Sequence, residues 1–222
     1  MTSSSEPLTL PALDDWPDHD PFPHAVIPCP ISDELMDRLE DTWEENGPWM
    51  IHSHENCERK YSCGHPQGWN PAATAAIEAL QSDAFIEWLR ELSGVDDLTV
   101  DPGLFGGGLH TMRHGGHLDM HLDFNRSNDL WRRVNVICFV NRLHRWEWGG
   151  ALVLEGRHGD QLDIPPRRGL VAFRYDEDAL HGVPGRVRGP ARKSIAMYYY
   201  SRQPPEIKSD HHHSTIYQEP EI

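Results

Sequence analysis

The sequence predicts a mainly β protein, a sandwich or a barrel, with helices packed on one of its sheets. From residue 98 onward, short apolar runs follow one another and are broken by Gly, Pro and charged residues, a texture typical of sandwiches and barrels. The part before residue 98 carries helix start signals instead. With 222 residues, the chain is long enough to bury a sizeable core in one domain.

Three helix starts stand in the first part of the chain. Ser32 can cap a helix that ends at Gly47. Asn70 precedes a proline, which is the arrangement of an N-cap followed by proline at the first helical position. Ser82 can cap a third helix that Gly94 closes. Apolar residues recur along these stretches, so we expect the helices to pack on the sheet.

The remaining boundaries follow from the same kind of signal. Strands are expected at residues 24–27, 98–101, 107–113, 120–124, 133–141, 151–155, 161–164, 169–174, 180–183 and 193–201. The expected boundaries are a poorly ordered N-terminal segment (1–23), one domain (24–202) with a helical part (24–97) and a β core (98–202), and a polar C-terminal tail (203–222). Residues 48–70 lack a regular period and are expected to form a lid or a substrate-contacting loop.

The charge balance limits the classes of partner. The chain carries 35 acidic and 20 basic residues, which gives a formal net charge of −15. This balance argues against nucleic acid, whose phosphates require a basic surface. It is compatible with a cationic small-molecule substrate, although solubility explains the charge more simply. Since no run of about eighteen apolar residues occurs, no membrane partner is expected. The oligomeric state, a homo-oligomer included, stays open.

The N-terminus and the cysteines bear on the cellular compartment. The first six residues have neither the basic nor the apolar region of a secretory signal. The four cysteines show no paired metal-binding spacing and no dense disulfide pattern. A reducing cytoplasm is the simplest inference from this usage.

A histidine-rich stretch around residues 115–124 carries the chemistry of the chain. Its last part alternates apolar and polar residues, which predicts a half-buried strand. Residues i and i+2 of a strand share a face, so His121 and Asp123 are expected to project together. One imidazole and one carboxylate are two of the three ligands that hold non-haem Fe(II). His181 is the best candidate for the third ligand.

Alternative interpretations of the stretch remain open from spacing alone. His117 and His121 have the spacing of a zinc protease helix, but Leu118 stands where that motif requires Glu. His117 and Asp119 form a second His-x-Asp pair, and a solvated histidine-rich loop is the third alternative. A zinc site within residues 48–70 would fit no common ligand spacing. The histidines after Asp210 are read as incidental.

The order of the site candidates resembles that of a known family. His121-x-Asp123 is followed by His181 after about sixty residues, and Arg192 lies eleven residues further on. The segments 132–141 and 146–152 stand between them. This arrangement resembles the 2-oxoglutarate- and iron(II)-dependent oxygenases, on the branch similar to prolyl 4-hydroxylase. The resemblance covers residues 105–201, with a weaker match around residues 24–43. The family motif Gly-Gly-x-Leu-x-x-His-x-Asp selects His121 and Asp123 as the ligand pair.

The resemblance implies a double-stranded β-helix, a jelly-roll or cupin-like fold, with Fe(II) and 2-oxoglutarate as cofactors. It implies His121, Asp123 and His181 as the metal ligands. Arg192 would hold the distal carboxylate of 2-oxoglutarate, which a guanidinium can contact through two parallel hydrogen bonds. Ser194, two residues further along the same strand face, can add a hydroxyl.

The sequence departs from the family pattern where tyrosines often contact the co-substrate. Met112 and Phe139 stand at those places. A donor role is therefore open, and Asn135 is a candidate because it shares strand parity with Phe139. By the same parity, Arg133 is expected to face the pocket.

The implied activity is an oxidation that releases succinate and CO₂. Halogenating members of the family have a small residue at the position of Asp123, so hydroxylation or oxidative ring closure is expected here. The resemblance also implies O₂ as a co-substrate. The compact, acidic chain favours a small polar, cationic metabolite as the substrate, with neither nucleic acid nor membrane as a partner. The alternatives are a peptidyl or protein hydroxylase and a non-catalytic, cupin-like metal-binding protein.

Overall fold

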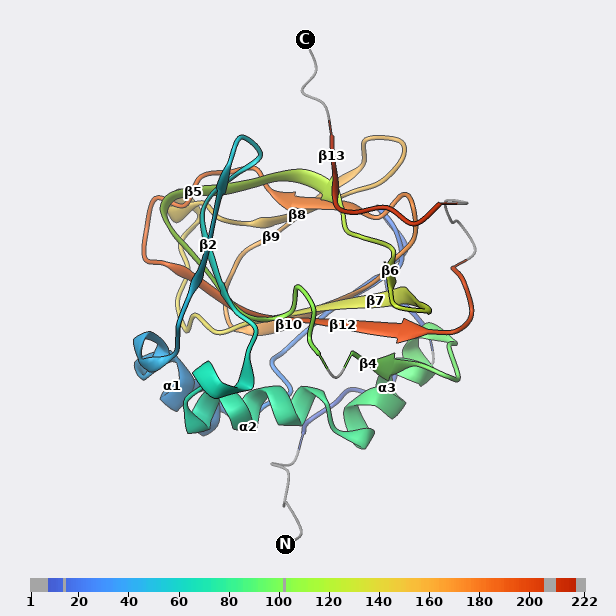
Figure 1. Ribbon diagram of the computed structural model, residues 1–222, viewed down its shortest axis with the longest axis horizontal. Helices are drawn as coiled ribbons and strands as arrows, with labels where there is room; N and C mark the ends of the chain where they lie inside the picture. The colour runs from blue at the N-terminus through green and yellow to red at the C-terminus, as the bar shows by residue number, and fades with distance from the viewer. Residues whose placement is uncertain (1–7, 14, 102, 206–210, 219–222) are drawn as a thin grey trace, which may run out of the picture.

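The computed structural model describes residues 8–13, 15–101, 103–205 and 211–218. Antiparallel strands form two facing layers, and helices cover the outside of one layer (Figure 1). The helices are α1 (Asp33–Asp41), α2 (Pro71–Leu80) and α3 (Asp83–Ser93). The strands are β1 (His24–Ile27), β2 (Met50–His54), β3 (Cys57–Cys63), β4 (Thr99–Val100), β5 (Gly108–Leu122), β6 (Arg126–Ser127), β7 (Leu130–Phe139), β8 (Leu152–Glu155), β9 (Gln161–Ile164), β10 (Gly169–Arg174), β11 (Leu180–Val183), β12 (Arg192–Ser201) and β13 (Ile216–Tyr217).

The sheet is continuous and curls back on itself. Its order is β1-β10-β7-β12-β5-β11-β8-β9, and every pair is antiparallel. The first part of β5 pairs with β12, and its last part pairs with β11. One strand therefore belongs to both layers, which confirms the expected mainly β, double-stranded β-helix fold.

Two glycines let β5 turn from one layer to the other. Gly115 has a φ of +83°, which side chains of L-residues rarely adopt. A Cβ on Gly116 would lie 2.5 Å from the Cγ of Met112 and 2.8 Å from the carbonyl oxygen of Arg113. The strand expected as two pieces, 107–113 and 120–124, is thus one bent strand.

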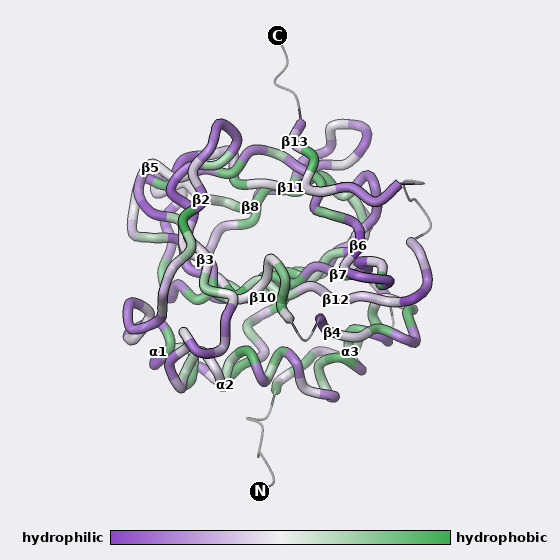
Figure 2. Tube along the Cα trace, in the orientation of Figure 1, coloured by the Kyte–Doolittle hydropathy of each residue, from purple (hydrophilic) through white to green (hydrophobic). Residues whose placement is uncertain are grey.

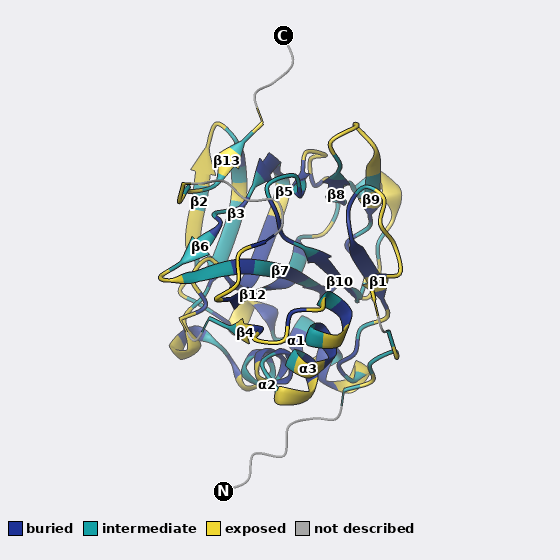
Figure 3. Cartoon of the chain, turned by 90° about the vertical axis from the view of Figure 1, so that its right-hand side faces the viewer, coloured by how far each residue is buried: buried dark blue, intermediate teal, exposed yellow. Residues whose placement is uncertain are grey.

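The helices begin and pack as the sequence predicts. Ser32, Asn70 and Ser82 each accept a hydrogen bond from a backbone N–H of the first helical turn. The apolar faces of the helices pack on the outer side of the layer that contains β7, β10 and β12. Figure 2 shows the apolar residues gathered between the helices and this layer, and Figure 3 shows that buried residues follow the same strands. A second, smaller apolar cluster lies between the two layers.

Three segments differ from the expectation. Residues 48–70 contain the antiparallel hairpin β2–β3, and β3 pairs with β5, so this segment extends the sheet instead of forming a loop. Trp16 and Phe22 are buried in the core, which corrects the expected disorder of residues 1–23 for the described residues of that segment. Residues 1–7 and 14 lie outside the described residues. In the C-terminal tail, β13 pairs with β5.

No helix in the described part of the chain is both long enough and apolar enough to cross a membrane.

Candidate metal centre and active site

Three side chains that the sequence predicts as ligands meet at one point of the fold. His121 lies at the end of β5, directly opposite His181 of β11, and Asp123 follows two residues after His121. One donor atom from each residue lies within 4.8 Å of the others. All three residues are buried. Two imidazoles and one carboxylate on adjacent strands are the donor set that suits Fe(II) and leaves positions open for other ligands.

The backbone orients both imidazoles. The Nδ1 of His121 donates to the carbonyl oxygen of Asp119 at 2.8 Å, and the Nδ1 of His181 donates to the carbonyl oxygen of Ala179 at 3.0 Å. The carbonyls can only accept, so each Nε2 carries the lone pair that a metal requires. Burial lowers the pKa of His121, and the neighbouring His181 lowers it further, which keeps His121 neutral at neutral pH.

The carboxylate of Asp123 is held by a buried arginine. The Nη1 of Arg132 donates to Oδ2 of Asp123 at 2.5 Å, and Nδ2 of Asn135 donates to the same oxygen at 2.9 Å. Burial alone would raise the pKa of Asp123, but the Arg132 guanidinium and the two imidazoles hold this pKa well below its usual range. Asp123 is therefore a carboxylate whose Oδ2 is fixed by Arg132 and Asn135 and lies 3.4 Å from Nε2 of His181, whereas its Oδ1 lies 3.7 Å from Nε2 of His121.

Aromatic rings hold Arg132 in place. Its Cζ lies 3.8 Å from the ring centroids of both Phe124 and Tyr198. A guanidinium between two ring faces gains cation–π attraction in a place that water cannot reach. The hydroxyl of Tyr175 donates to the backbone carbonyl of Asp123 at 2.8 Å and fixes the ligand's main chain as well.

Arg192 and Ser194 share the cavity with the three ligands, as the sequence predicts. The cavity also contains Lys60, His110 and Asn135. The Nε of Arg192 donates to the carbonyl oxygen of Gly150 at 3.1 Å, and its Nη1 donates to Oγ of Ser194 at 3.1 Å. The rest of the guanidinium is free to bind a carboxylate. Burial lowers the pKa of Arg192 to about 10, so this side chain is still charged at neutral pH.

Two expectations about strand β7 change in the structure. The register between β7 and β12 shifts between Tyr199 and Tyr200, because two residues of β7 stand against one of β12. This bulge reverses the parity, so Arg132 faces the cavity, whereas Arg133 is directed outward and donates to the carbonyl oxygen of Gln203. The expectation that Arg133 faces the pocket, which followed from the alternation of residues along the strand, is therefore wrong. Asn135 does face the cavity, but its amide donates to Asp123.

His117 and His213 lie apart from the three ligands. His117 is on β5, not on a helix, and its ring nitrogens lie 3.7 Å from Glu58 and 3.5 Å from Asp119. The Nε2 of His213 lies 2.9 Å from the carboxylate of Glu177. Among the residues that the structure describes, only His121, Asp123 and His181 form a group that could hold a metal. Asp210 lies outside the described residues.

The C-terminal tail lies against the site, which the sequence did not predict. Tyr217 pairs with His121 across β13 and β5, and the two rings are 5.6 Å apart. The backbone N–H of Gln218 donates to the carbonyl oxygen of Met120 at 2.9 Å. The tail is polar and pairs mainly through its backbone, so no apolar pattern in the sequence marks it as a strand.

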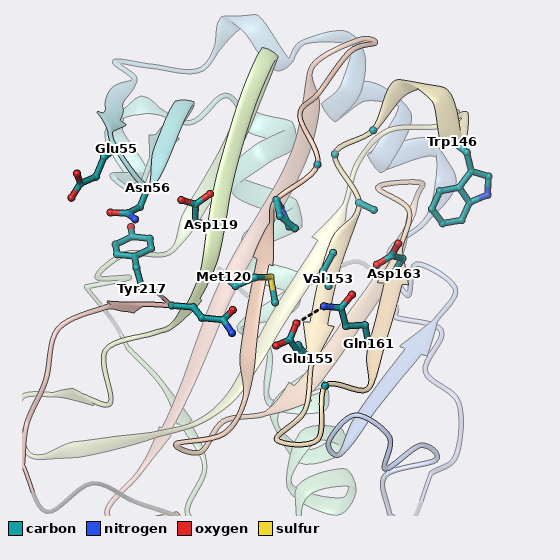
Figure 4. Close-up of a pocket in the computed structure, with 17 residues that line it drawn as sticks. Glu55, Asn56, Asp119, Met120, Trp146, Val153, Glu155, Gln161, Asp163 and Tyr217 are labelled. Carbon is teal, nitrogen blue, oxygen red and sulfur yellow. Dashed lines mark hydrogen bonds between the residues drawn. The ribbon is translucent and has the colours of Figure 1, made fainter. Parts of the chain in front are cut away.

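A wide groove lies on the other face of the layer that carries His181. Val153 and Glu155 of β8 line it, whereas Leu152 and Leu154, which alternate with them along the strand, belong to the inner apolar cluster. Figure 4 shows Glu55 and Tyr217 on one side of the groove and Trp146 on the other. The groove is therefore outside the barrel, and the catalytic candidates are in the smaller inner cavity.

Comparison with known proteins identifies the class. Residues 107–200 match the family model of the 2OG-Fe(II) oxygenase superfamily. The match covers the strands from β5 to β12, which carry the candidate metal ligands and Arg192. It indicates an oxidoreductase of the dioxygenase type, from a family that uses Fe(II) and 2-oxoglutarate. No curated protein sequence matches the chain significantly.

Solved structures with the same fold belong to this class of oxygenase. A prolyl-4-hydroxylase from Pseudomonas putida is 16% identical, with 81% of this chain and 92% of that chain covered and a TM-score of 0.59. A prolyl hydroxylase from Trichoplax adhaerens, in complex with a hypoxia inducible factor peptide, is 17% identical over 80% and 83% of the chains, with a TM-score of 0.60. HygX from Streptomyces hygroscopicus, with nickel, 2-oxoglutarate and hygromycin B bound, is 13% identical over 80% and 82%, with a TM-score of 0.58.

Replacing Arg132 by Met tests the role of the buried ion pair. The variant leaves the buried carboxylate of Asp123 without its cation, so we expect a loss of about 3–5 kcal/mol in the free energy of unfolding of the metal-free protein. Arg133→Met is the matched control, because it removes an outward-facing arginine from the same strand. Urea denaturation measures both. Equal losses in the two variants would contradict the assignment.

Buried His110 is expected to make the free energy of unfolding depend on pH. Burial, then Lys60, holds the pKa of His110 well below its ordinary value. As pH falls below about 6.5, His110 is protonated in the unfolded chain but stays neutral in the folded protein. The free energy of unfolding therefore decreases toward acid pH. His110→Leu is expected to flatten this slope by up to about 1.4 kcal/mol per pH unit. Urea denaturation of the metal-free protein between pH 7 and 5 measures it, and an unchanged slope would contradict it.

Proposed function

We propose that His121, Asp123 and His181 hold Fe(II), and that Arg192 binds the distal carboxylate of 2-oxoglutarate beside it. The observation that carries this proposal is one inner cavity that contains both the three donor atoms within 4.8 Å and a buried arginine. The donor set fits the metal, because both imidazoles present Nε2 and the carboxylate is ionised. Ser194 contributes by orienting Arg192.

The protein's own residues prepare the site for the reaction. When bound, Fe(II) and 2-oxoglutarate supply the oxidising chemistry: O₂ is consumed, 2-oxoglutarate becomes succinate and CO₂, and the substrate is oxidised. Arg132 keeps Asp123 ionised and fixed, and the backbone carbonyls keep both imidazoles in the binding tautomer. Asn135 helps to position Asp123, because its Nδ2 donates to the carboxylate. The carboxylate at residue 123 supports hydroxylation or oxidative ring closure.

The proposed substrate is a small polar metabolite. The support is an inner cavity of modest size lined by polar and cationic side chains. The net charge of −15 is compatible with a cationic group on this metabolite. The four unpaired cysteines support a reducing compartment such as the cytoplasm.

A bare, cupin-like metal binder is the less favoured function. A protein that only binds a metal does not require a buried guanidinium directed toward the metal-binding cavity. Burial of that charge carries a desolvation penalty. Arg192 is 7% exposed and faces the same cavity as the three ligands. Its presence therefore favours turnover with a carboxylate co-substrate.

Alanine variants of the ligands test the metal site. Removing any one of the side chains of His121, Asp123 or His181 is expected to abolish Fe(II) retention and succinate formation, because only two donors remain. His117→Ala is the matched control, since it removes a buried histidine of the same strand that lies outside the cluster. Iron content after gel filtration and succinate release are the readouts. Full activity in any ligand variant, or loss in the control alone, would contradict the assignment.

Substrate class is tested by stimulation of 2-oxoglutarate turnover. A panel of small polar acids, amino acids and sugars is compared with proline-containing peptides at matched concentrations. We expect stimulation of succinate release by a small metabolite. Stimulation by peptides alone would replace the proposal with a peptidyl hydroxylase.

A further inference from the structure

Lys60 extends a second cation into the catalytic cavity. Lys60 on β3 lies opposite Met112 on β5, and Met112 lies opposite Arg192 on β12. Cross-strand partners share a face of the sheet, so Lys60 and Arg192 flank Met112 on the inner face. Their backbones are two strand spacings apart, about 10 Å. A lysine and an arginine can span that gap from both sides, and both line the cavity.

The ammonium of Lys60 has no partner among the residues that the structure describes. No carboxylate oxygen of these residues lies within 4.0 Å of its Nζ, and no hydrogen bond joins it to them. Desolvation in the cavity lowers the pKa of Lys60, and Cys57 and Asp123 partly offset that effect. Asp123 is already paired with Arg132. A half-buried cation that lines an inner cavity without a counterion is unfavourable, so its retention points to an anion that enters the cavity.

The other donors in the cavity are largely committed. Arg192 uses Nε on Gly150 and Nη1 on Ser194. Asn135 donates to Asp123, and the Phe139 ring, 5.0 Å from the Arg192 guanidinium, offers no donor. A carboxylate bound at Arg192 therefore receives no hydrogen bond from Asn135 or Phe139. Lys60 lines the same cavity as the metal ligands and Arg192.

We propose that Lys60 is a second binding residue for 2-oxoglutarate, contacting the bound dianion together with Arg192. This inference rests on the proposed function, because 2-oxoglutarate must span from the metal ligands to Arg192. Lys60 then replaces the missing hydroxyl donor at Phe139 from a different strand of the fold. The consequence is selectivity: two cations in one cavity favour a 2-oxo acid with two carboxylates over one with a single carboxylate.

Binding of two co-substrates to Fe(II)-loaded protein under anaerobic conditions tests the proposal. The probes are 2-oxoglutarate and 2-oxobutanoate, which lacks the distal carboxylate, and calorimetric titration gives each Kd. The variants are Lys60→Met, which keeps the stem without the charge, and Lys60→Arg, which keeps the charge. Arg113→Met is the matched control, because this exposed cation lies next to Met112 on the outer face. Thermal unfolding of each metal-free variant is the second readout.

The expected result separates a binding role from a structural one. Lys60→Met should weaken 2-oxoglutarate binding by about tenfold to about a hundredfold, the range of a charge-assisted hydrogen bond. It should change 2-oxobutanoate binding much less, and its metal-free Tm should equal or exceed that of the wild type, since an unpaired charge in the cavity is gone. Lys60→Arg should restore most of the affinity, and Arg113→Met should match the wild type.

Two results would overturn the assignment of Lys60. One is wild-type affinity for 2-oxoglutarate in Lys60→Met. The other is an equal loss for both 2-oxo acids together with a lower Tm, which would show a structural role. A wild-type protein that retains iron and binds neither 2-oxo acid would instead reject the proposed function itself. The two failures are therefore distinguishable.

Discussion

The buried ion pair between Arg132 and Asp123 is the interaction on which the site depends. The carboxylate is buried between two imidazoles, where desolvation favours the protonated acid. The arginine reverses that preference, and two aromatic rings and a strand bulge hold the arginine in turn. An anionic ligand at this depth is possible because its cation is supplied by the fold. The positions of β7 and β12 thus determine the charge state of a residue on β5.

The bend of β5 brings the two halves of the site together. Its first part lies beside the strand that carries Arg192, and its last part carries His121 beside His181. Gly115 and Gly116 permit that bend, since side chains there would be strained or would collide with Met112. The same strand also pairs with β3, which places Lys60 between the two halves. The cavity, its metal ligands and its cations therefore follow from the course of one strand.

The sequence predicted those features that depend on local spacing. The caps at Ser32, Asn70 and Ser82 mark real helix starts, and the alternation around His121 and Asp123 correctly placed both on one face of a strand. The third ligand and Arg192 came from the order of residues along the chain, which resembled a known family.

The features that were missed depend on pairing between distant segments. The bulge that turns Arg132 inward arises from the register of β7 with β12, which no local pattern encodes. The hairpin β2–β3 and strand β13 attach to β5 mainly through backbone hydrogen bonds, so their side chains show no apolar alternation. Lys60 could not be recognised before its strand was placed.

The metal site and the 2-oxoglutarate site are tested most directly by anaerobic addition of Fe(II) and 2-oxoglutarate to the metal-free protein, followed by visible absorption. Chelation of the metal by 2-oxoglutarate gives a weak charge-transfer band. We expect this band in the wild type, its absence in Asp123→Ala, and a much higher 2-oxoglutarate requirement in Arg192→Met. A band of undiminished strength in Asp123→Ala, or no band in a wild-type protein that retains iron, would contradict the assignment of the two sites.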